Sequence, residues 1–306
     1  MHASLNALLH AGTPLHHLWR EWIFPPAMVL PLAAAAVLYG RGLRVLWTTH
    51  AGRGVRRWEA ACFGCGWLAA VLALLSPLHA LSERLFVAHM VQHELLMVVA
   101  APLLVLGRPL VPSLWAFPAP TRQRVGALLR HRAVRYTSRV LVQPLGAFAL
   151  HGAAIWFWHI PRVFQATLEN DLVHALQHVS FFATALLFWW TVVHAQGPRG
   201  SVRATGYGLA VLLLFATTLH TGALGALLTF SRTVWYPAYG SFGVRWGLSP
   251  LEDQQLAGML MWIPASAAYL AAALPLAVRW LRASEQRVRG SALFVEIDRP
   301  RGPAQA

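Results

Sequence analysis

The sequence contains no lysine, only two cysteines and few charged residues. All 25 basic residues are arginines, 11 residues are acidic, and charged residues make up 12% of the 306 positions. A chain without lysine cannot form a retinal Schiff base, which excludes a retinal protein. Two cysteines cannot form a disulfide framework of the kind that stabilises small secreted domains. So low a fraction of charge also excludes an ordinary soluble domain.

Long apolar segments make up much of the chain. Hydrophobic residues account for 57% of the sequence, and 14 residues are tryptophan. A helix needs about 20 apolar residues to cross ~30 Å of hydrocarbon. We therefore expect an all-α, multi-pass membrane protein with seven transmembrane helices, at residues 24–40, 58–78, 86–106, 140–158, 171–193, 205–229 and 255–279.

The arginines predict how the chain is oriented in the lipid bilayer. Twenty of the 25 follow the first, third, fifth or seventh predicted span, and five lie on the other side. The positive-inside rule therefore places the N-terminus outside and the C-terminus in the cytoplasm. Three regions follow: an outer segment at 1–23, a transmembrane domain at 24–280 and a cytoplasmic basic tail at 281–306. Because the formal net charge of +14 is spread over several loops, we expect no nucleic-acid partner.

Two pairs of histidines, each with a spacing of four residues, lie near the outer ends of predicted spans. His89 and His93 begin the third span, and His174 and His178 begin the fifth. Residues four apart lie on one face of a helix, so each pair directs two imidazoles the same way. A glutamine precedes the second histidine of both pairs, and both pairs lie at the same depth. This similarity resembles an internal duplication that places a site at the repeat interface.

The same topology places His151 and His220 in the outer half of the membrane as well. Polar groups inside a bilayer are costly unless they face a partner. Imidazole is the commonest ligand of transition metals and suits Cu, Zn and Fe. We therefore predict a metal or haem site whose ligands come from His89, His93, His151, His174, His178 and His220.

Five other residues are accessory candidates. Glu94 points about 100° away from His93 on a helix and is either an orienting partner of an imidazole or a contact to a neighbouring helix. Met97, four residues beyond His93, offers a thioether to Cu(I), and His159 lies in an aromatic run at the end of the fourth span. Cys62 and Cys65, near the inner face, can bind a soft metal or cycle as a dithiol, although their neighbouring glycines indicate close helix packing.

Facing histidines also suit two other functions. A bis-imidazole haem protein that transfers electrons would take its axial ligands from opposed helices. A membrane zinc hydrolase would need an open metal position and a base such as Glu94. However, Leu95, Leu96 and Met97 follow Glu94, so the usual helical zinc motif with two histidines around a glutamate is absent. The hydrolase therefore ranks below the haem protein.

Further motifs accompany the histidine pairs along the chain. The motifs are His89-x-x-Gln-His93-Glu94, Gly107-Arg108-Pro109, His151 with Trp156-x-Trp158-His159-x-Pro161, and His174-x-x-Gln-His178 followed by Ser180-Phe-Phe. Together with the seven spans, they resemble the CtaG-type cytochrome c oxidase assembly factors of bacteria. The histidines that match the family's pattern are His89, His93, His151, His159, His174 and His178. His220 and Met97 are candidates because of their depth alone.

The resemblance implies a protein of the bacterial plasma membrane that helps a haem-copper cytochrome c oxidase to mature and is not itself an enzyme. Its expected chemistry is delivery of copper, and its expected partners are oxidase subunits or copper chaperones. We expect copper to enter from the outer side near the aromatic loop at 230–254. Imidazoles of the third and fifth spans would hold the ion, with His151 or His220 completing the shell.

Overall fold

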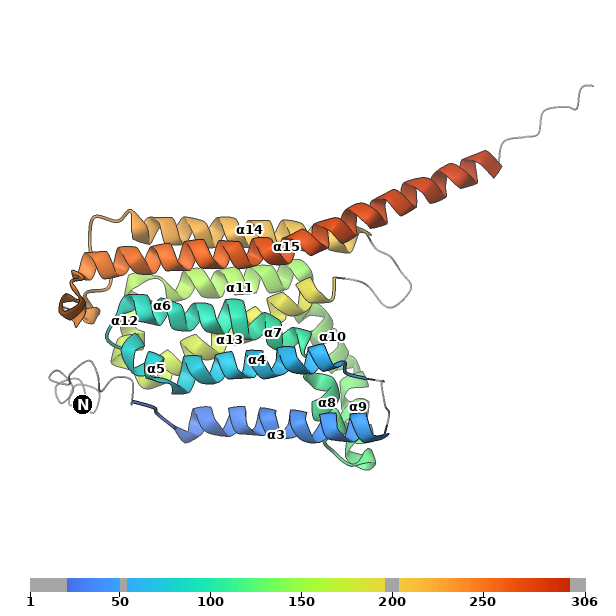
Figure 1. Cartoon of the computed structure of the whole chain (residues 1–306), viewed down its shortest axis with the longest axis horizontal. Helices are drawn as coiled ribbons and strands as arrows, with labels where there is room; N and C mark the ends of the chain where they lie inside the picture. Colours follow the sequence, from blue (N-terminus) through green and yellow to red (C-terminus); the bar gives the residue numbers. More distant parts are fainter. Residues whose placement is uncertain (1–20, 50–53, 196–203, 241, 298–306) are drawn as a thin grey trace, which may run out of the picture.

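The computed structural model describes residues 21–49, 54–195, 204–240 and 242–297. Within these ranges all regular secondary structure is helical, as predicted. The long helices run side by side in a bundle, and short helices connect their ends (Figure 1). The bundle helices are α3 Pro26–Thr49, α4 Arg57–Leu75, α6 Phe86–Glu94, α7 Ala101–Leu106, α11 Pro144–Trp158, α13 Asp171–Val193, α14 Ala204–Thr229 and α15 Pro250–Ile297.

The short helices gather at the two ends of the bundle. At one end lie α5 (Pro77–Ser82), α12 (Pro161–Glu169) and the chain between α14 and α15 (Figure 1), which contains the 3-10 turns η2 (Pro237–Tyr239) and η3 (Phe242–Trp246). At the other end lie α8 (Leu110–Trp115), α9 (Ala119–Arg130) and α10 (Arg132–Leu141). The arginine-rich loop at 108–139 therefore lies at the end opposite to α5 and α12.

In the part of the chain that the structure describes, six helices are long and apolar enough to cross a membrane. They are Pro26–Thr49, Arg57–Leu75, Phe86–Leu106, Asp171–Val193, Gly206–Thr229 and Pro250–Val288. The predicted fourth span at 140–158 is not one continuous helix, because α10 ends at Leu141 and a new helix, α11, begins at Pro144. Proline lacks the N–H that a helix interior needs but is well suited to a first helical turn. With 15 residues, α11 lies in the bundle yet falls short of the usual span length.

The helix that carries His89 and His93 changes its winding directly after Glu94. A π-helical segment, η1 (Leu95–Ala100), joins α6 to α7. Pro102, in the first turn of α7, has no N–H for an ordinary helical bond, and a π-turn is one way to accommodate the missing bond. As a result α6 packs on α15, whereas η1 and α7 pack on α4 and α13.

The main hydrophobic core draws its buried residues from α6, α7, α11, α12, α13, α14 and α15. Phe86, Phe164, Phe181, Phe188 and Leu214 are fully buried there. The α14–α15 pair packs closely because both helices carry glycine at the contact. A Cβ atom on Gly225 would lie 2.8 Å from the carbonyl oxygen of Gly258, so a larger side chain would force the two backbones apart.

Two of the predicted regions lie at the ends of the chain. The predicted outer segment at 1–23 lies almost wholly outside the described residues. The predicted boundary between the transmembrane domain and the tail at residue 281 falls inside α15, which continues to Ile297. This last part of α15 projects beyond the bundle (Figure 1).

Candidate metal centre

Side-chain caps fix the first turns of the two helices that carry the histidine pairs. The backbone N–H groups of Phe86 and Val87 donate to the two carboxylate oxygens of Asp253 on α15, at 2.8 and 3.0 Å. At the start of α13, the N–H groups of Leu172 and Val173 donate to Oδ1 of Asn170, at 2.9 and 3.2 Å. First-turn N–H groups have no partner within their own helix, so these acceptors set where each helix begins.

The two histidine pairs face each other across the contact between α6 and α13. The ring centroids of His89 and His174 lie 5.3 Å apart, and those of His93 and His178 lie 5.2 Å apart. Within each helix the two rings are 4.3 and 4.4 Å apart. The two pairs are therefore level, as their positions in the sequence predicted. We call these four residues the histidine cluster.

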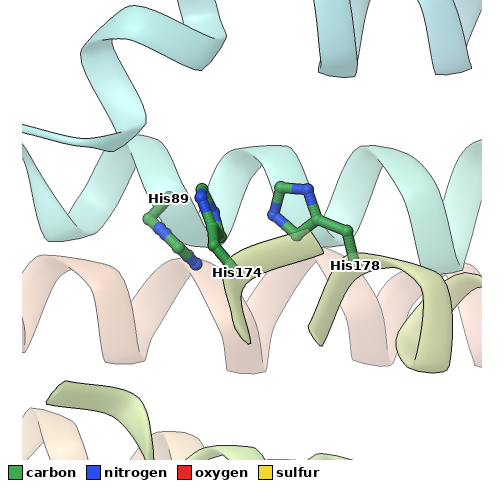
Figure 2. A group of neighbouring side chains, drawn as sticks. All are labelled: His89, His174 and His178. Carbon is green, nitrogen blue, oxygen red and sulfur yellow. The ribbon is translucent and has the colours of Figure 1, made fainter. Parts of the chain in front are cut away.

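Three members of the histidine cluster converge closely enough to share one ion. His89, His174 and His178 each offer a ring nitrogen, and these nitrogens all lie within 4.8 Å of one another. Figure 2 shows the three imidazoles gathered in one space between α6 and α13. Zn–N bonds of 2.0–2.1 Å place two nitrogens of a tetrahedral site about 3.4 Å apart. Small side-chain rotations would therefore complete a three-imidazole site.

Several ring nitrogens of the histidine cluster make no hydrogen bond among the described residues. Nδ1 of His89 donates to the carbonyl oxygen of Ser82 at 3.3 Å. Since a carbonyl can only accept, Nε2 of His89 keeps a lone pair, and this nitrogen makes no hydrogen bond of normal geometry among the described residues, although the Gln177 side chain lies near enough to interact with the ring. Nε2 of His174 and both ring nitrogens of His93 and His178 also lack such a bond. This kind of carbonyl contact is how proteins commonly set the tautomer of a metal-binding histidine.

Burial makes these unpartnered nitrogens costly. His89 is 0% exposed, and His93 and His178 are 2% and 5% exposed. A polar group without a partner in such an environment costs several kcal/mol. A bound cation would satisfy several of these nitrogens at once. The donor set consists only of imidazoles and fits copper or zinc rather than the hard cations Mg²⁺ and Ca²⁺, which take oxygen ligands.

The structure adds His79 of α5, which the sequence did not single out as a candidate. Its ring stacks on His174 at 5.8 Å and meets His178 edge-on at 6.3 Å. Nδ1 of His79 accepts from Nε2 of Gln92 at 2.9 Å, and Nε2 faces the carboxylate of Glu83 at 3.7 Å. Burial lowers the pKa of His79, and the nearby carboxylate of Asp171 partly opposes this effect. Because Nδ1 is hydrogen-bonded to Gln92 and Nε2 is directed to Glu83, His79 borders the cluster and is not counted among its ligands.

A sequence signal for His79 did exist. Ser76-Pro77 is typical of a helix start, and Glu83 follows His79 by four residues, so the two side chains lie on one face of a short helix. The predicted second span ended at residue 78 and left His79 in a loop. Because α4 stops at Leu75 and α5 turns across the end of the bundle, the imidazole reaches the cluster instead.

His159 borders the cluster at the end of α11. Its Nδ1 donates to the carbonyl oxygen of Ile155 at 2.7 Å, and its Nε2 has no partner among the described residues. Burial lowers the pKa of His159 to about 4, with the bond to Ile155 acting in the opposite direction. The ring lies beside Phe164 and Phe181, with centroids 6.3 and 6.1 Å away. His159 is therefore a neutral neighbour of the cluster.

His151 and His220 form a second group, separate from the histidine cluster. Nδ1 of His151 contacts Oγ1 of Thr184 at 3.0 Å, and its ring stacks on Phe188. Thr184 lies six residues beyond His178, which is about 9 Å further along α13. His220 of α14 packs against Phe148, next to Gly152. One of these two histidines was expected to complete the shell of the cluster, but His151 meets α13 at Thr184, further along the helix than His178.

The remaining candidates lie outside the histidine cluster. Glu94 is half-buried and interacts electrostatically with Tyr269 of α15, which matches the predicted contact to a neighbouring helix. Met97 lies in η1, packs in the apolar core, and its carbonyl oxygen accepts from Trp189. Cys62 is partly exposed and Cys65 is exposed on α4. Among the described residues, only His89, His174 and His178 form a group of three or more that could hold a metal ion.

The aromatic loop predicted at 230–254 folds over the cluster, although α15 already begins at Pro250. The hydroxyl group of Tyr236 donates to the carbonyl oxygen of His159 at 2.8 Å. The side chain of Gln254 accepts from the N–H of Trp235 at 2.6 Å and donates to the carbonyl oxygen of Thr233 at 3.1 Å. The Tyr239 ring lies 6.3 Å from His89. These bonds hold the loop against the end of the bundle where the cluster lies.

The chain is similar to one described protein family and to two curated relatives. The sequence model for the cytochrome c oxidase caa3 assembly factor (Caa3_CtaG) matches residues 37–283, a range that contains every residue of the cluster and its walls. Uncharacterized proteins of Mycobacterium bovis and Mycobacterium tuberculosis are each 26% identical to it over 270 residues, which is 85% of this chain. The chain spans 39% of the length of these relatives. No solved structure matches it.

Proposed function

This chain belongs to the cytochrome c oxidase caa3 assembly factor family, and from that premise we propose that it binds copper in the histidine cluster and delivers it to a haem-copper oxidase. It would act as a multi-pass protein of the bacterial plasma membrane, with seven spans that include the short helix α11. Its partners would be oxidase subunits or copper chaperones. The role is that of a carrier, and no catalytic step is proposed.

One observation carries the proposal. His89, His174 and His178 place three ring nitrogens within 4.8 Å of one another, and Nε2 of each of these imidazoles makes no hydrogen bond among the described residues. His89, His174 and His178 would hold the ion, with His93 beside them. Three neutral imidazoles stabilise a copper ion and can release it again by exchanging one ligand at a time with a partner.

The packing around the cluster favours an ion over haem. Phe164 and Tyr239 contact His89, and Phe181 contacts His93, at ring distances of 5.1, 6.3 and 4.7 Å. Bis-imidazole haem requires a whole macrocycle between two opposed histidines. The rings of His89 and His174 are 5.3 Å apart and are surrounded by these aromatic side chains, which leaves space for an ion but not for a porphyrin.

A zinc hydrolase is also disfavoured. Such an enzyme needs a base beside the metal-bound water. Glu94, the candidate base, makes its electrostatic contact with Tyr269 of α15. The Glu83 carboxylate lies 3.7 Å from Nε2 of His79, which is not a member of the cluster.

Metal content and the visible spectrum of the purified protein test the proposal. We expect about one copper per chain in the wild type and a loss of that copper in His89→Ala/His178→Ala. The matched control is His151→Ala/His220→Ala, which removes two imidazoles from the second group and should retain the copper. Equal copper in all three proteins would show that the cluster is structural. A Soret band that disappears with His89 and His178 would identify haem instead.

A further inference from the structure

The histidine cluster comes nearest to the protein surface at His174. His174 is half-buried, whereas His89, His93 and His178 are buried. Asp171 precedes His174 by three residues, one turn earlier on α13, and is exposed. Residues three apart lie on the same side of a helix, and the Asp171 carboxylate interacts electrostatically with His174 and with His79. The Asp171 carboxylate therefore lies one helical turn before His174, the most accessible member of the cluster, on the same side of α13.

A second carboxylate reaches the same place from α5. The side chain of Glu83 is 59% exposed, and its Oε1 lies 3.7 Å from Nε2 of His79. His79 in turn stacks on His174. The carboxylates of Glu83 and Asp171 interact electrostatically with each other. Two acidic side chains from different helices thus lie on the solvent side of the same two imidazoles.

Two of the three charged side chains that act on Glu83 are themselves acidic, namely Asp171 and Glu21. Arg84 is the cation next to Glu83, but it pairs with Glu21 at 3.5 Å and lies over the ring of Phe242 at 5.6 Å. Among the described residues linked in this way, three carboxylates (Glu21, Glu83 and Asp171) accompany one guanidinium group (Arg84), in a protein whose formal net charge is +14. Charge of one sign beside a site raises the local concentration of ions of the opposite sign.

We propose that Glu83 and Asp171 form an acidic mouth through which a copper cation enters the histidine cluster at His174. The proposal rests on the proposed function, because it assumes that the cluster binds the ion. The unpartnered nitrogens of His178 and His89, which lie beneath His174 and are 5% and 0% exposed, point to a cation as the species drawn inward. His79 lines the mouth: its Nδ1 accepts a hydrogen bond from Gln92, and its Nε2 lies 3.7 Å from the Glu83 carboxylate.

Electrostatic steering predicts a change in the rate of copper uptake rather than in the number of copper ions bound. The mouth lies outside the set of ligands, so removal of its charge leaves the number of bound ions the same. Steering by charge accelerates association by 10- to 1000-fold in strong fields and fades as salt screens it. Because Arg84 partly offsets the charge of the two carboxylates, we expect the acceleration of copper association to lie near the lower end of this range.

The test measures how fast the metal-free protein in detergent takes up Cu²⁺ supplied as its chloride. Stopped-flow absorption follows the copper–imidazole band, and only the part of the signal that His89→Ala/His178→Ala lacks is analysed. We expect Glu83→Gln/Asp171→Asn to load roughly threefold to tenfold more slowly than the wild type at ~10 mM salt, and less than about twofold more slowly at ~0.5 M salt. Its final copper content should equal that of the wild type.

The control is Glu169→Gln, which removes a nearby exposed carboxylate that is bonded to Gln165 and should load at the wild-type rate. If Glu83→Gln/Asp171→Asn loads as fast as Glu169→Gln and fills completely, the mouth is refuted while the copper site stands. If the wild type shows no signal that depends on His89 and His178, the copper site and the mouth are refuted together.

Discussion

The two histidine groups of this protein both lie against α13 but are built differently. In the histidine cluster, pairs from α6 and α13 face each other, and three ring nitrogens lie within 4.8 Å of one another. In the second group, His151 turns one nitrogen to Thr184 and His220 packs against Phe148. Unpartnered imidazole nitrogens occur in both groups. A buried histidine is therefore a weak sign of a metal site, and convergence of several imidazoles is the stronger one.

A matched pair of single substitutions should separate the two groups most clearly. His174 and His220 are both half-buried, so their replacement by alanine removes similar contacts. We expect His174→Ala to weaken copper binding by about 100-fold or more, because loss of even an outer-shell partner costs 10- to 100-fold, and His220→Ala to change it by less than about threefold. Competition with a copper chelator measures both. Similar losses in the two variants would mean that the groups act as one site.

The pH dependence of stability should identify His159 as a buried neutral neighbour of the cluster. Its pKa is lowered to about 4 by burial, so between pH 6.5 and 4 the unfolded chain takes up a proton that the folded protein does not. The contribution of His159 to the free energy of unfolding is therefore complete above pH 6.5. It is lost as the pH falls through this window, by about 2 kcal/mol between pH 7 and pH 5.

Thermal unfolding in detergent at several pH values measures this effect. His159→Asn, which keeps a donor near the carbonyl group of Ile155, should remove that part of the pH dependence. The exposed His131 supplies the control, since His131→Asn should leave the slope unchanged. A wild-type slope that persists in His159→Asn would assign it to another group.

The Asp253 side chain of α15, which caps α6, should affect the histidine cluster and its copper binding but not the second group. Asp253→Ala removes the acceptor of two buried N–H groups at the start of α6 and should destabilise the protein by about 1.5 kcal/mol. It should also weaken copper binding, because the first turn of α6 carries His89. Asp253→Asn retains one carbonyl acceptor and should lose less. A variant as stable as the wild type would show that the α6 start is held by its other contacts.

Met97 should be nearly neutral for copper despite its spacing from His93. Its side chain lies in the apolar core, and exchange of methionine for leucine in a core usually costs less than ~1.5 kcal/mol. We expect Met97→Leu to change copper affinity by less than about twofold, measured in the same chelator assay. A larger loss of affinity would give the thioether the ligand role that its position in the sequence suggested.

Local rules made the main features of the fold and the histidine cluster predictable. Apolar length indicated the helices, and a spacing of four at two helix starts placed His89, His93, His174 and His178 at one level. His79 escaped prediction because it depends on where α4 stops and how α5 turns. The separation of His151 and His220 from the cluster was not predicted, because depth in a membrane is a single coordinate, whereas the positions of metal ligands depend on all three. The break before Pro144 was missed because apolar residues on either side of it hid the proline.

The π-helical segment η1 sets the rotation of α6 relative to α7, and therefore the direction in which His89 and His93 point. It adds the equivalent of one residue to the helix between the histidines of α6 and the contacts of α7, and one residue corresponds to a rotation of about 100°. Deletion of a single residue from η1 would restore an ordinary α-helix and turn His89 and His93 away from α13 while α7 kept its place. Insertions and deletions in this stretch are therefore far more harmful than substitutions, and the wide turn is what allows one continuous span to present different faces to α15 and to α4.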